Sequence, residues 1–120
     1  MIASMGSPRL TPETLQVLTA MAGRPSDRHY GLELAEEARL PKGSIYPMLA
    51  RLERTGLVTS EWEEIDESVA GRRRRRYYVL TAEGARVAVY ELDRMKAVAE
   101  RLEQGLPALR RLFPEIGGSA

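Results

Sequence analysis

Cysteine is absent from this 120-residue sequence, and histidine occurs once, as His29. The absence of cysteine excludes disulfide bonds, thiolate metal sites and cysteine nucleophiles. A single histidine cannot build a multi-histidine metal site, and it leaves little basis for histidine-dependent catalysis. The sequence also has no glycine-rich phosphate loop and no recognisable pair of catalytic carboxylates. We therefore expect a protein that is not an enzyme and that holds no metal and no cofactor.

Long hydrophobic runs are also missing. No apolar stretch approaches the roughly 20 residues that cross a bilayer, and residues 1–8 hold none long enough for a secretory signal. We expect a cytoplasmic protein that does not bind membranes. Phe and Trp occur once each, so the predicted core is aliphatic and modest in size. Chains of this size often gain stability by forming dimers.

The charges of the chain nearly balance, with 18 Lys and Arg against 17 Asp and Glu. Overall charge therefore does not indicate a nucleic-acid partner. The kind of cation is more informative, because Lys42 and Lys96 are the two lysines and all the other cations are arginines. Arginine has a planar, permanently charged head group that suits phosphates and guanine edges.

Capping and turn signals divide the chain into helices and strands. Thr11 and Pro12 are typical of a helix start, and Gly56 is typical of a helix end. The periodicity predicts helices over residues 12–22, 30–38 and 43–55, strands over 57–64 and 75–80 joined by a hairpin turn, and a long helix from residue 82. We expect Gly105 and Pro107 to bend this last helix and to begin a separate short helix.

Three helices followed by a two-stranded ribbon form the arrangement of a winged helix-turn-helix. The predicted fold class is mainly α with a small β-hairpin (α+β), and a long C-terminal helix is added for dimerisation. The predicted divisions are a flexible N-terminal arm at 1–10, a winged helix-turn-helix domain at 11–81, a helical dimerisation region at 82–116 and a tail at 117–120. Trp62 is expected in the core or at a hinge. One of Tyr77 and Tyr78 is expected to be buried and the other exposed.

The third predicted helix supplies candidate DNA contacts. In a helix-turn-helix, the second helix enters the major groove, and its N-terminal residues reach the base edges. The candidates are Lys42, Ser44, Tyr46 and Pro47 near the start of the helix, and Arg51 and Arg54 further along. An ordinary amphipathic helix with a solvated polar side would show the same pattern, so this helix alone leaves both interpretations open.

The predicted hairpin carries five consecutive arginines. They are Arg72, Arg73, Arg74, Arg75 and Arg76. At a hairpin tip all five can be exposed and can contact phosphates or the minor groove. The alternative is a solvated run that pairs with the nearby acids Glu61, Glu63, Glu64, Asp66 and Glu67. We favour DNA contact, because five adjacent like charges repel one another when no polyanion is bound.

The last predicted helix carries a heptad seam. Apolar residues recur at alternating spacings of three and four across four heptads, which is the pattern of a helix that pairs with another helix. The seam consists of Ala85, Ala88, Leu92, Met95, Ala99, Leu102, Leu106, Leu109 and Phe113. The alternative is that the helix only covers the core of its own domain. The seam is too long for that small domain, so we expect a homodimer.

Two strings of residues resemble the PadR family of bacterial transcription regulators. Residues 43–58 read GSIYPMLARLERTGLV, and residues 75–84 read RRYYVLTAEG. The resemblance implies a homodimeric winged-helix DNA-binding protein, usually a repressor that a small molecule releases. It also implies that Ser44, Tyr46 and Pro47 lie at the start of the recognition helix and that the arginine run lies in the wing.

The sequence therefore predicts a homodimeric, sequence-specific DNA-binding transcription regulator. By resemblance it is expected to be a repressor that responds to a small-molecule effector. Its predicted partners are double-stranded DNA with a palindromic operator and a second copy of the chain. The alternative is a winged-helix module that binds another protein and has no sequence-specific DNA binding. The near-neutral charge favours this alternative, and the arginine run disfavours it.

Overall fold

The computed structural model describes residues 10–116 and divides the chain into two compact units. The units are Met1–Ala88 and Val89–Ala120, and the boundary lies inside the longest helix. The predicted tail, and the predicted arm apart from Leu10, lie outside the described residues. The predicted division after residue 81 differs from this boundary, because the first turns of the last helix pack against the core of the first unit.

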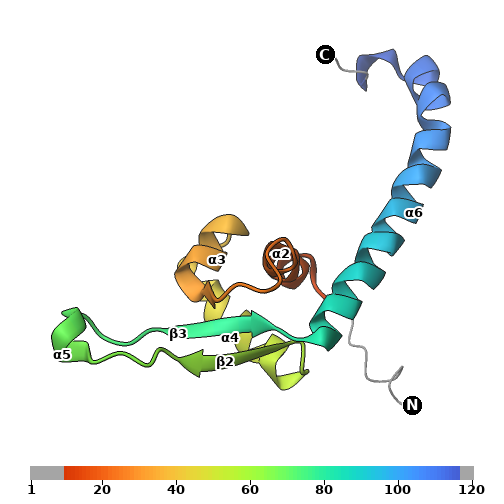
Figure 1. Ribbon diagram of the computed structural model, residues 1–120. Helices are drawn as coiled ribbons and strands as arrows, with labels where there is room; N and C mark the ends of the chain where they lie inside the picture. The colour runs from red at the N-terminus through yellow and green to blue at the C-terminus, as the bar shows by residue number, and fades with distance from the viewer. Residues whose placement is uncertain (1–9, 117–120) are drawn as a thin grey trace. The chain divides into compact units, whose positions relative to one another are not determined.

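The first unit combines short helices with a small antiparallel sheet (Figure 1). In chain order the elements are α2 (Pro12–Ala22), β1 (His29–Tyr30), α3 (Gly31–Glu37), α4 (Lys42–Arg54), β2 (Val58–Trp62), α5 (Glu67–Ala70) and β3 (Arg76–Leu80), followed by α6 (Ala82–Leu112) and a 3-10 turn at Pro114–Ile116. The predicted α+β winged helix-turn-helix is confirmed. In Figure 1 β2 and β3 lie side by side and lead into the wing, whose tip at α5 extends beyond α3 and α4.

The helix ends follow the predicted capping chemistry. The Thr11 side chain accepts a hydrogen bond from the Thr14 backbone N–H at 3.1 Å, and Pro12 fills the first helical position. Gly56 ends α4 with φ of +81°, a left-handed conformation that glycine adopts without strain. The Leu57 N–H then donates to the Leu52 carbonyl at 2.9 Å, so the chain turns sharply from α4 into β2.

The sheet has three strands, whereas the sequence predicted two. β3 lies in the middle, and β1 pairs with it antiparallel through His29 opposite Tyr78 and Tyr30 opposite Tyr77. Residue 30 was expected to begin a helix. A two-residue strand has no periodicity of its own, so only its pairing partner reveals it. His29 is buried there, and its Nε2 lies 2.9 Å from the Arg24 carbonyl oxygen.

The aromatic residues of the ribbon are placed differently from the expectation. Tyr77 and Tyr78 are both buried, because Tyr78 faces the core while β1 brings Tyr30 against Tyr77. Trp62 is half-exposed at the end of β2, so it does not lie in the core, which was one of its two predicted places. Its indole instead lies under the Arg76 guanidinium, 5.4 Å from the ring centre.

The core of the first unit is aliphatic, as the composition indicated. Its members come from α2, α3, α4, β2, β3 and the start of α6, and the most buried are Val17, Leu18, Met21, Leu34, Ile45, Leu49, Leu52 and Val58. Thr81 fastens α6 to this core: its hydroxyl donates to the Gly56 carbonyl at 2.7 Å and accepts from the Gly84 N–H at 2.9 Å. The helix therefore begins in close contact with the segment after α4.

The last helix is continuous through the residues that were expected to interrupt it. α6 runs from Ala82 to Leu112, with Pro107 inside it, so the predicted separate helix after Gly105 is wrong. Pro107 has no N–H and leaves one helical carbonyl without its partner, which favours local curvature but does not end a helix held by its other hydrogen bonds. The last turns of α6 curve in Figure 1.

We predict that Gly84→Ala destabilises the first unit. A Cβ at this position would lie 2.2 Å from the Leu57 carbonyl oxygen, which is backbone and cannot rotate away. We expect a loss of about 1–3 kcal/mol in the free energy of unfolding, measured by chemical denaturation. The control is Gly43→Ala, where a Cβ would meet nothing within 4 Å, so alanine should be neutral or stabilising. Equal stability of the two variants would contradict the prediction.

Candidate nucleic-acid interface

The exposed face of α4 carries cations and small side chains but no carboxylate. Lys42, Arg51 and Arg54 are exposed, and within residues 10–116 none of them forms an ion pair. The acid of this helix, Glu53, accepts a hydrogen bond from the Ser60 hydroxyl at 2.8 Å on the side toward β2. A polyanion that approaches α4 from solvent therefore meets positive charge without a competing acid.

The predicted contacts at the start of α4 surround a stripe of small residues. Gly43, Pro47 and Ala50 are exposed at the spacings of one helix face, and Ser44 beside them is half-buried. Their lack of bulk allows the backbone of the helix to come close to a partner surface. Pro47 lies in the second turn, inside α4. Because proline has no N–H, one backbone hydrogen bond of the helix is absent near its start.

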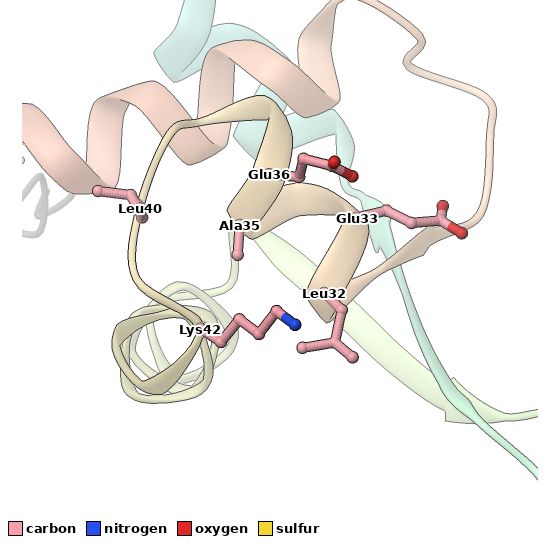
Figure 2. A pocket seen from close by; sticks show the side chains of 6 residues that line it. All are labelled: Leu32, Glu33, Ala35, Glu36, Leu40 and Lys42. Carbon is pink, nitrogen blue, oxygen red and sulfur yellow. The ribbon is translucent and has the colours of Figure 1, made fainter.

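The Lys42 side chain lies along a shallow hollow of about 310 Å³ between α3 and α4. Figure 2 shows its ammonium group reaching toward Leu32, while the carboxylates of Glu33 and Glu36 point away from it. Leu32 is half-exposed at the edge of this hollow. The lysine is therefore held near the turn of the helix-turn-helix with its charge unneutralised.

Tyr46 has a packing role in addition to its exposure. Its ring lies directly over Gly31 at the start of α3, since a Cβ on Gly31 would come within 2.6 Å of Tyr46 Cε1. The side chain is nevertheless half-exposed. Tyr46 thus joins the two helices of the helix-turn-helix and presents the rest of its ring to solvent.

Arg39 is an exposed cation in the turn before α4, on the side toward α2, and sequence reasoning missed it. It lies in the turn between α3 and α4 with φ of +59°, although residues other than glycine rarely adopt this conformation. Its N–H donates to the Glu36 carbonyl and the Leu40 N–H donates to the Ala35 carbonyl, which together close α3. No residue in the sequence signals this left-handed turn, because the residue that follows the predicted helix over 30–38 is an arginine and not a glycine.

The arginine run of the wing is tied to acids of its own chain. Arg72 contacts Glu63, Arg74 contacts Glu67, Arg75 contacts Glu33 and Glu63, and Arg76 contacts Glu53. For Arg73 no ion pair is found within the described part of the chain. Arg76 also donates to the Ser60 hydroxyl at 2.7 Å, so the base of the wing and the last turn of α4 share the Ser60–Glu53 contact. Arg76 is thus the arginine of the run that contacts α4, through Glu53.

Glu63 is the centre of the wing network. Its side chain is 8% exposed and accepts hydrogen bonds from both terminal nitrogens of Arg72 at 2.8 and 3.2 Å. It also accepts from the Arg75 N–H at 2.8 Å and from the Tyr30 hydroxyl at 3.2 Å. The bonds from Arg72 and Arg75 lower the pKa of the Glu63 carboxyl from 4.5 to about 2. The same contact raises the pKa of Arg72.

The tip of the wing contains a short helix where the sequence predicted only a turn. Asp66 caps α5 by accepting from the Ser68 N–H at 3.0 Å, and this bond and one from the Ser68 hydroxyl lower the pKa of Asp66. Gly71 ends α5 with φ of +74°. Arg72 and Arg73 follow directly, so the arginine run starts at a defined point of the tip.

The predicted dimerisation residues fall into two groups. Ala88 is buried against the core of the first unit, which contradicts its predicted place in a contact between two chains, and Ala85 is partly buried there. Beyond Ala88, Leu92, Met95, Ala99, Leu102 and Phe113 are exposed in the described chain, and Leu106 and Leu109 are intermediate. Within residues 89–116, most of the apolar face that begins at Leu92 is therefore exposed.

Comparison with known proteins decides the family. The family model described as "Transcriptional regulator PadR-like family" matches residues 26–89, which is more than half of the chain. The chain belongs to this PadR-like family. The match covers the helix-turn-helix and the wing, and it confirms the resemblance that the two sequence strings indicated. No curated protein sequence gives a significant match to this PadR-like chain.

Solved structures agree with the fold of this PadR-like protein. A PadR family transcription regulator from hypervirulent Clostridium difficile is 25% identical with a TM-score of 0.67, and the match covers 80% of this chain and 99% of that one. A PadR family regulator from Eggerthella lenta is 23% identical with a TM-score of 0.61, covering 78% and 84%. Staphylococcus aureus MepR, solved in complex with DNA, is 18% identical with a TM-score of 0.64, covering 90% and 82%.

The family is one of transcription regulators and not of enzymes. Within residues 10–116 of this PadR-like chain, no three His, Asp or Glu side chains gather in a way that could hold a metal ion. Every helix in the same range is too short or too polar to span a bilayer.

We predict that the wing of this PadR-like protein loosens in acid through Glu63. Its pKa is lower in the folded protein, about 2, than its ordinary value of 4.5. The carboxylate therefore stabilises the fold above pH 4.5, and this contribution is lost as the pH falls from 4.5 toward 2. The fluorescence of Trp62, the single tryptophan, should report the change because it lies beside Arg76.

Glu63→Gln should remove that acid transition, while Glu64→Gln, at an exposed neighbouring position, should retain it. A Trp62 signal with the same pH dependence in wild type and in Glu63→Gln would show that Glu63 does not hold the wing.

Proposed function

We propose that this protein is a homodimeric, sequence-specific DNA-binding transcription regulator of the cytoplasm. The observation that carries the proposal is the exposed face of α4, where three cations have no acid partner among residues 10–116. A helix of 13 residues that presents Lys42 at one end and Arg51 and Arg54 at the other suits a major groove, whose phosphates lie on both sides of the helix.

Recognition of base edges falls to the start of α4. Ser44 and Tyr46 carry hydroxyl groups that donate and accept, and Lys42 carries a donor that suits guanine or phosphate. The neighbouring small residues Gly43, Pro47 and Ala50 let the helix enter the groove deeply. Arg51 and Arg54 then hold phosphates and set the register of the helix.

A second copy of the chain is the proposed cover for the apolar face of α6. This face is broad, because Val98 and Leu112 extend the seam of Leu92, Met95 and Leu102, and each of these five side chains is at least 42% exposed. An apolar face of this width is broader than the narrow a/d seam of a two-helix coiled coil, so a partner must bury more of the helix surface. A two-fold dimer would place two recognition helices on a palindromic operator, which multiplies the affinity of each half-site.

The proposal includes repression and control by a small molecule, as the resemblance to the PadR family implies. In a dimer the distance between the two α4 helices depends on how the α6 helices pack. An effector that binds one packing better than another shifts the population of dimers that fit the operator. A crosslink between paired α6 helices should then abolish the response to the effector.

The alternative function is a winged-helix module that binds another protein. The observation that favours it is the pairing of four of the five wing arginines with acids, which reduces the charge available to DNA. The uncompensated cations of α4 favour DNA, since they lie on the face that a helix-turn-helix presents to the groove.

We predict that Ala50→Glu weakens DNA binding without loss of stability. Ala50 is exposed in α4, so the substitution adds an acid to the proposed contact face, where phosphate repels it. Affinity for the DNA upstream of the protein's own gene should fall at least about tenfold, or about 1.4 kcal/mol. Fluorescence anisotropy at two salt concentrations, with excess unrelated competitor DNA, measures the change.

Ala97→Glu, an exposed position of α6, is the matched control and should bind like wild type at both salt concentrations. Wild-type binding that survives the competitor and weakens with salt supports the proposal. Absence of wild-type binding even at low salt would favour the protein-binding module, and equal affinities of Ala50→Glu and wild type would move the contact away from α4.

We predict that replacing Leu92 and Met95 with Asp yields a monomer. Two charges in the first turns of the apolar face would remain unpaired and desolvated in a dimer. Sedimentation or light scattering at micromolar concentration measures the mass. Ala97→Asp, on the opposite side of the same helix, should leave the dimer intact. A double variant that remains dimeric would place the interface elsewhere.

A further inference from the structure

Arg72 is committed to a buried carboxylate. Its two terminal nitrogens lie 2.8 and 3.2 Å from the oxygens of Glu63, whose side chain is 8% exposed. If the guanidinium turned outward to bind a phosphate, it would leave a buried charge without its main partner, which is strongly destabilising. Arg72 is therefore unavailable to DNA, although it belongs to the run that the sequence assigned to it.

Arg75 connects the wing to the helix-turn-helix. Its side chain lies 3.8 Å from Glu63 and 3.8 Å from Glu33 of α3. Its guanidinium also stacks over the Tyr30 ring, 3.9 Å from the ring centre. Contacts with a wing acid, a helix acid and a β1 aromatic together fix the angle at which the wing leaves the sheet.

The other paired arginines are held less tightly or lie at the base of the wing. Arg74 and Glu67 are both half-exposed and 3.7 Å apart, an arrangement that contributes little. Arg76 donates to the Ser60 hydroxyl and covers Trp62, so it lies beside β2 and away from the tip.

Arg73 differs from its four neighbours. Its carbonyl oxygen accepts a hydrogen bond from Arg72 Nη1 at 3.0 Å, so the guanidinium that is fixed on Glu63 also fixes the Arg73 backbone. Its side chain is exposed, and the described residues offer it no ion pair. A free cation is thus mounted on a rigid point of the wing tip.

We propose that Arg73 is the arginine of the run that binds a DNA phosphate, and that Arg72 and Arg75 are positioning residues that hold the wing through Glu63. This assignment rests on the proposed DNA-binding function. It replaces five equivalent contacts with one contact and a support, because Glu63 holds Arg72 and Arg75, Arg76 lies on Ser60 and Trp62, and Arg74 has Glu67 within 3.7 Å.

The test measures the affinity of a random-sequence DNA duplex as a function of salt, since a phosphate contact needs no operator. The proteins are wild type, Arg73→Gln, Arg72→Gln and the double variant, with Arg101→Gln on α6 as a control of equal charge change. Arg73→Gln should reduce the slope of log K against log salt by about 0.9 per protomer. Arg72→Gln should weaken binding in the wild-type background and change it by less than about twofold in the Arg73→Gln background.

Lysine variants distinguish an arginine that contacts phosphate from an arginine that positions the wing. Arg73→Lys should keep the salt slope, because a point charge satisfies a phosphate. Arg72→Lys should behave like Arg72→Gln, because an ammonium group cannot make the two-nitrogen contact with Glu63. If Arg72→Gln does not fold, as judged by Trp62 fluorescence and thermal unfolding, Arg75→Gln takes its place in the same comparison.

Two outcomes would overturn the assignment alone. One is wild-type binding that Arg73→Gln leaves unchanged, and the other is a second slope decrease of about 0.9 when Arg72→Gln is added to Arg73→Gln. A wild-type protein that binds no duplex at low salt would instead reject the proposed function, and the assignment with it.

Discussion

A carboxylate that is buried in the wing must be paired, and the partners of Glu63 come from separate segments of the chain. Arg72 and Arg75 lie in the segment between α5 and β3, and Tyr30 lies in β1. These contacts organise the ribbon, because two antiparallel strands are marginal by themselves. This single carboxylate therefore links the short β1 to the loop that leads into β3. The shape of the surface that the wing offers to a partner therefore depends on an interaction inside the protein.

On the surface of α4, in contrast to the wing, the cations are not paired with acids of the described chain. The acid of this helix, Glu53, contacts Ser60 and Arg76. In the described part of the chain, no acid pairs with its exposed cations Lys42 and Arg51. Within residues 10–116, ion pairs thus neutralise most of the wing arginines and leave the cations of α4 uncompensated, although the whole chain is nearly neutral. Net charge is a poor guide here, because a partner responds to the local distribution.

The sequence predicted the elements well wherever a side chain signals a backbone conformation. Thr11 with Pro12 and the glycine at position 56 mark helix ends because their chemistry acts locally. Predictions were wrong where a distant residue decides the outcome. β1 exists because β3 lies beside it, α6 continues through Pro107 because the rest of its helical hydrogen bonds remain, and Ala88 is buried because the start of α6 packs on its own core.

The sequence by itself determined the fold class, the family and the existence of an apolar face on the last helix. These properties depend on periodicity, caps and short motifs, which act over a few residues. Only the tertiary structure decided which arginines are free. Ion pairing depends on which acids folding brings within about 4 Å, and Glu33, Glu53 and Glu63 approach the arginine run from three different elements. The spacing of residues along the sequence does not determine those distances. Five adjacent arginines that look alike in the sequence therefore differ in the folded wing.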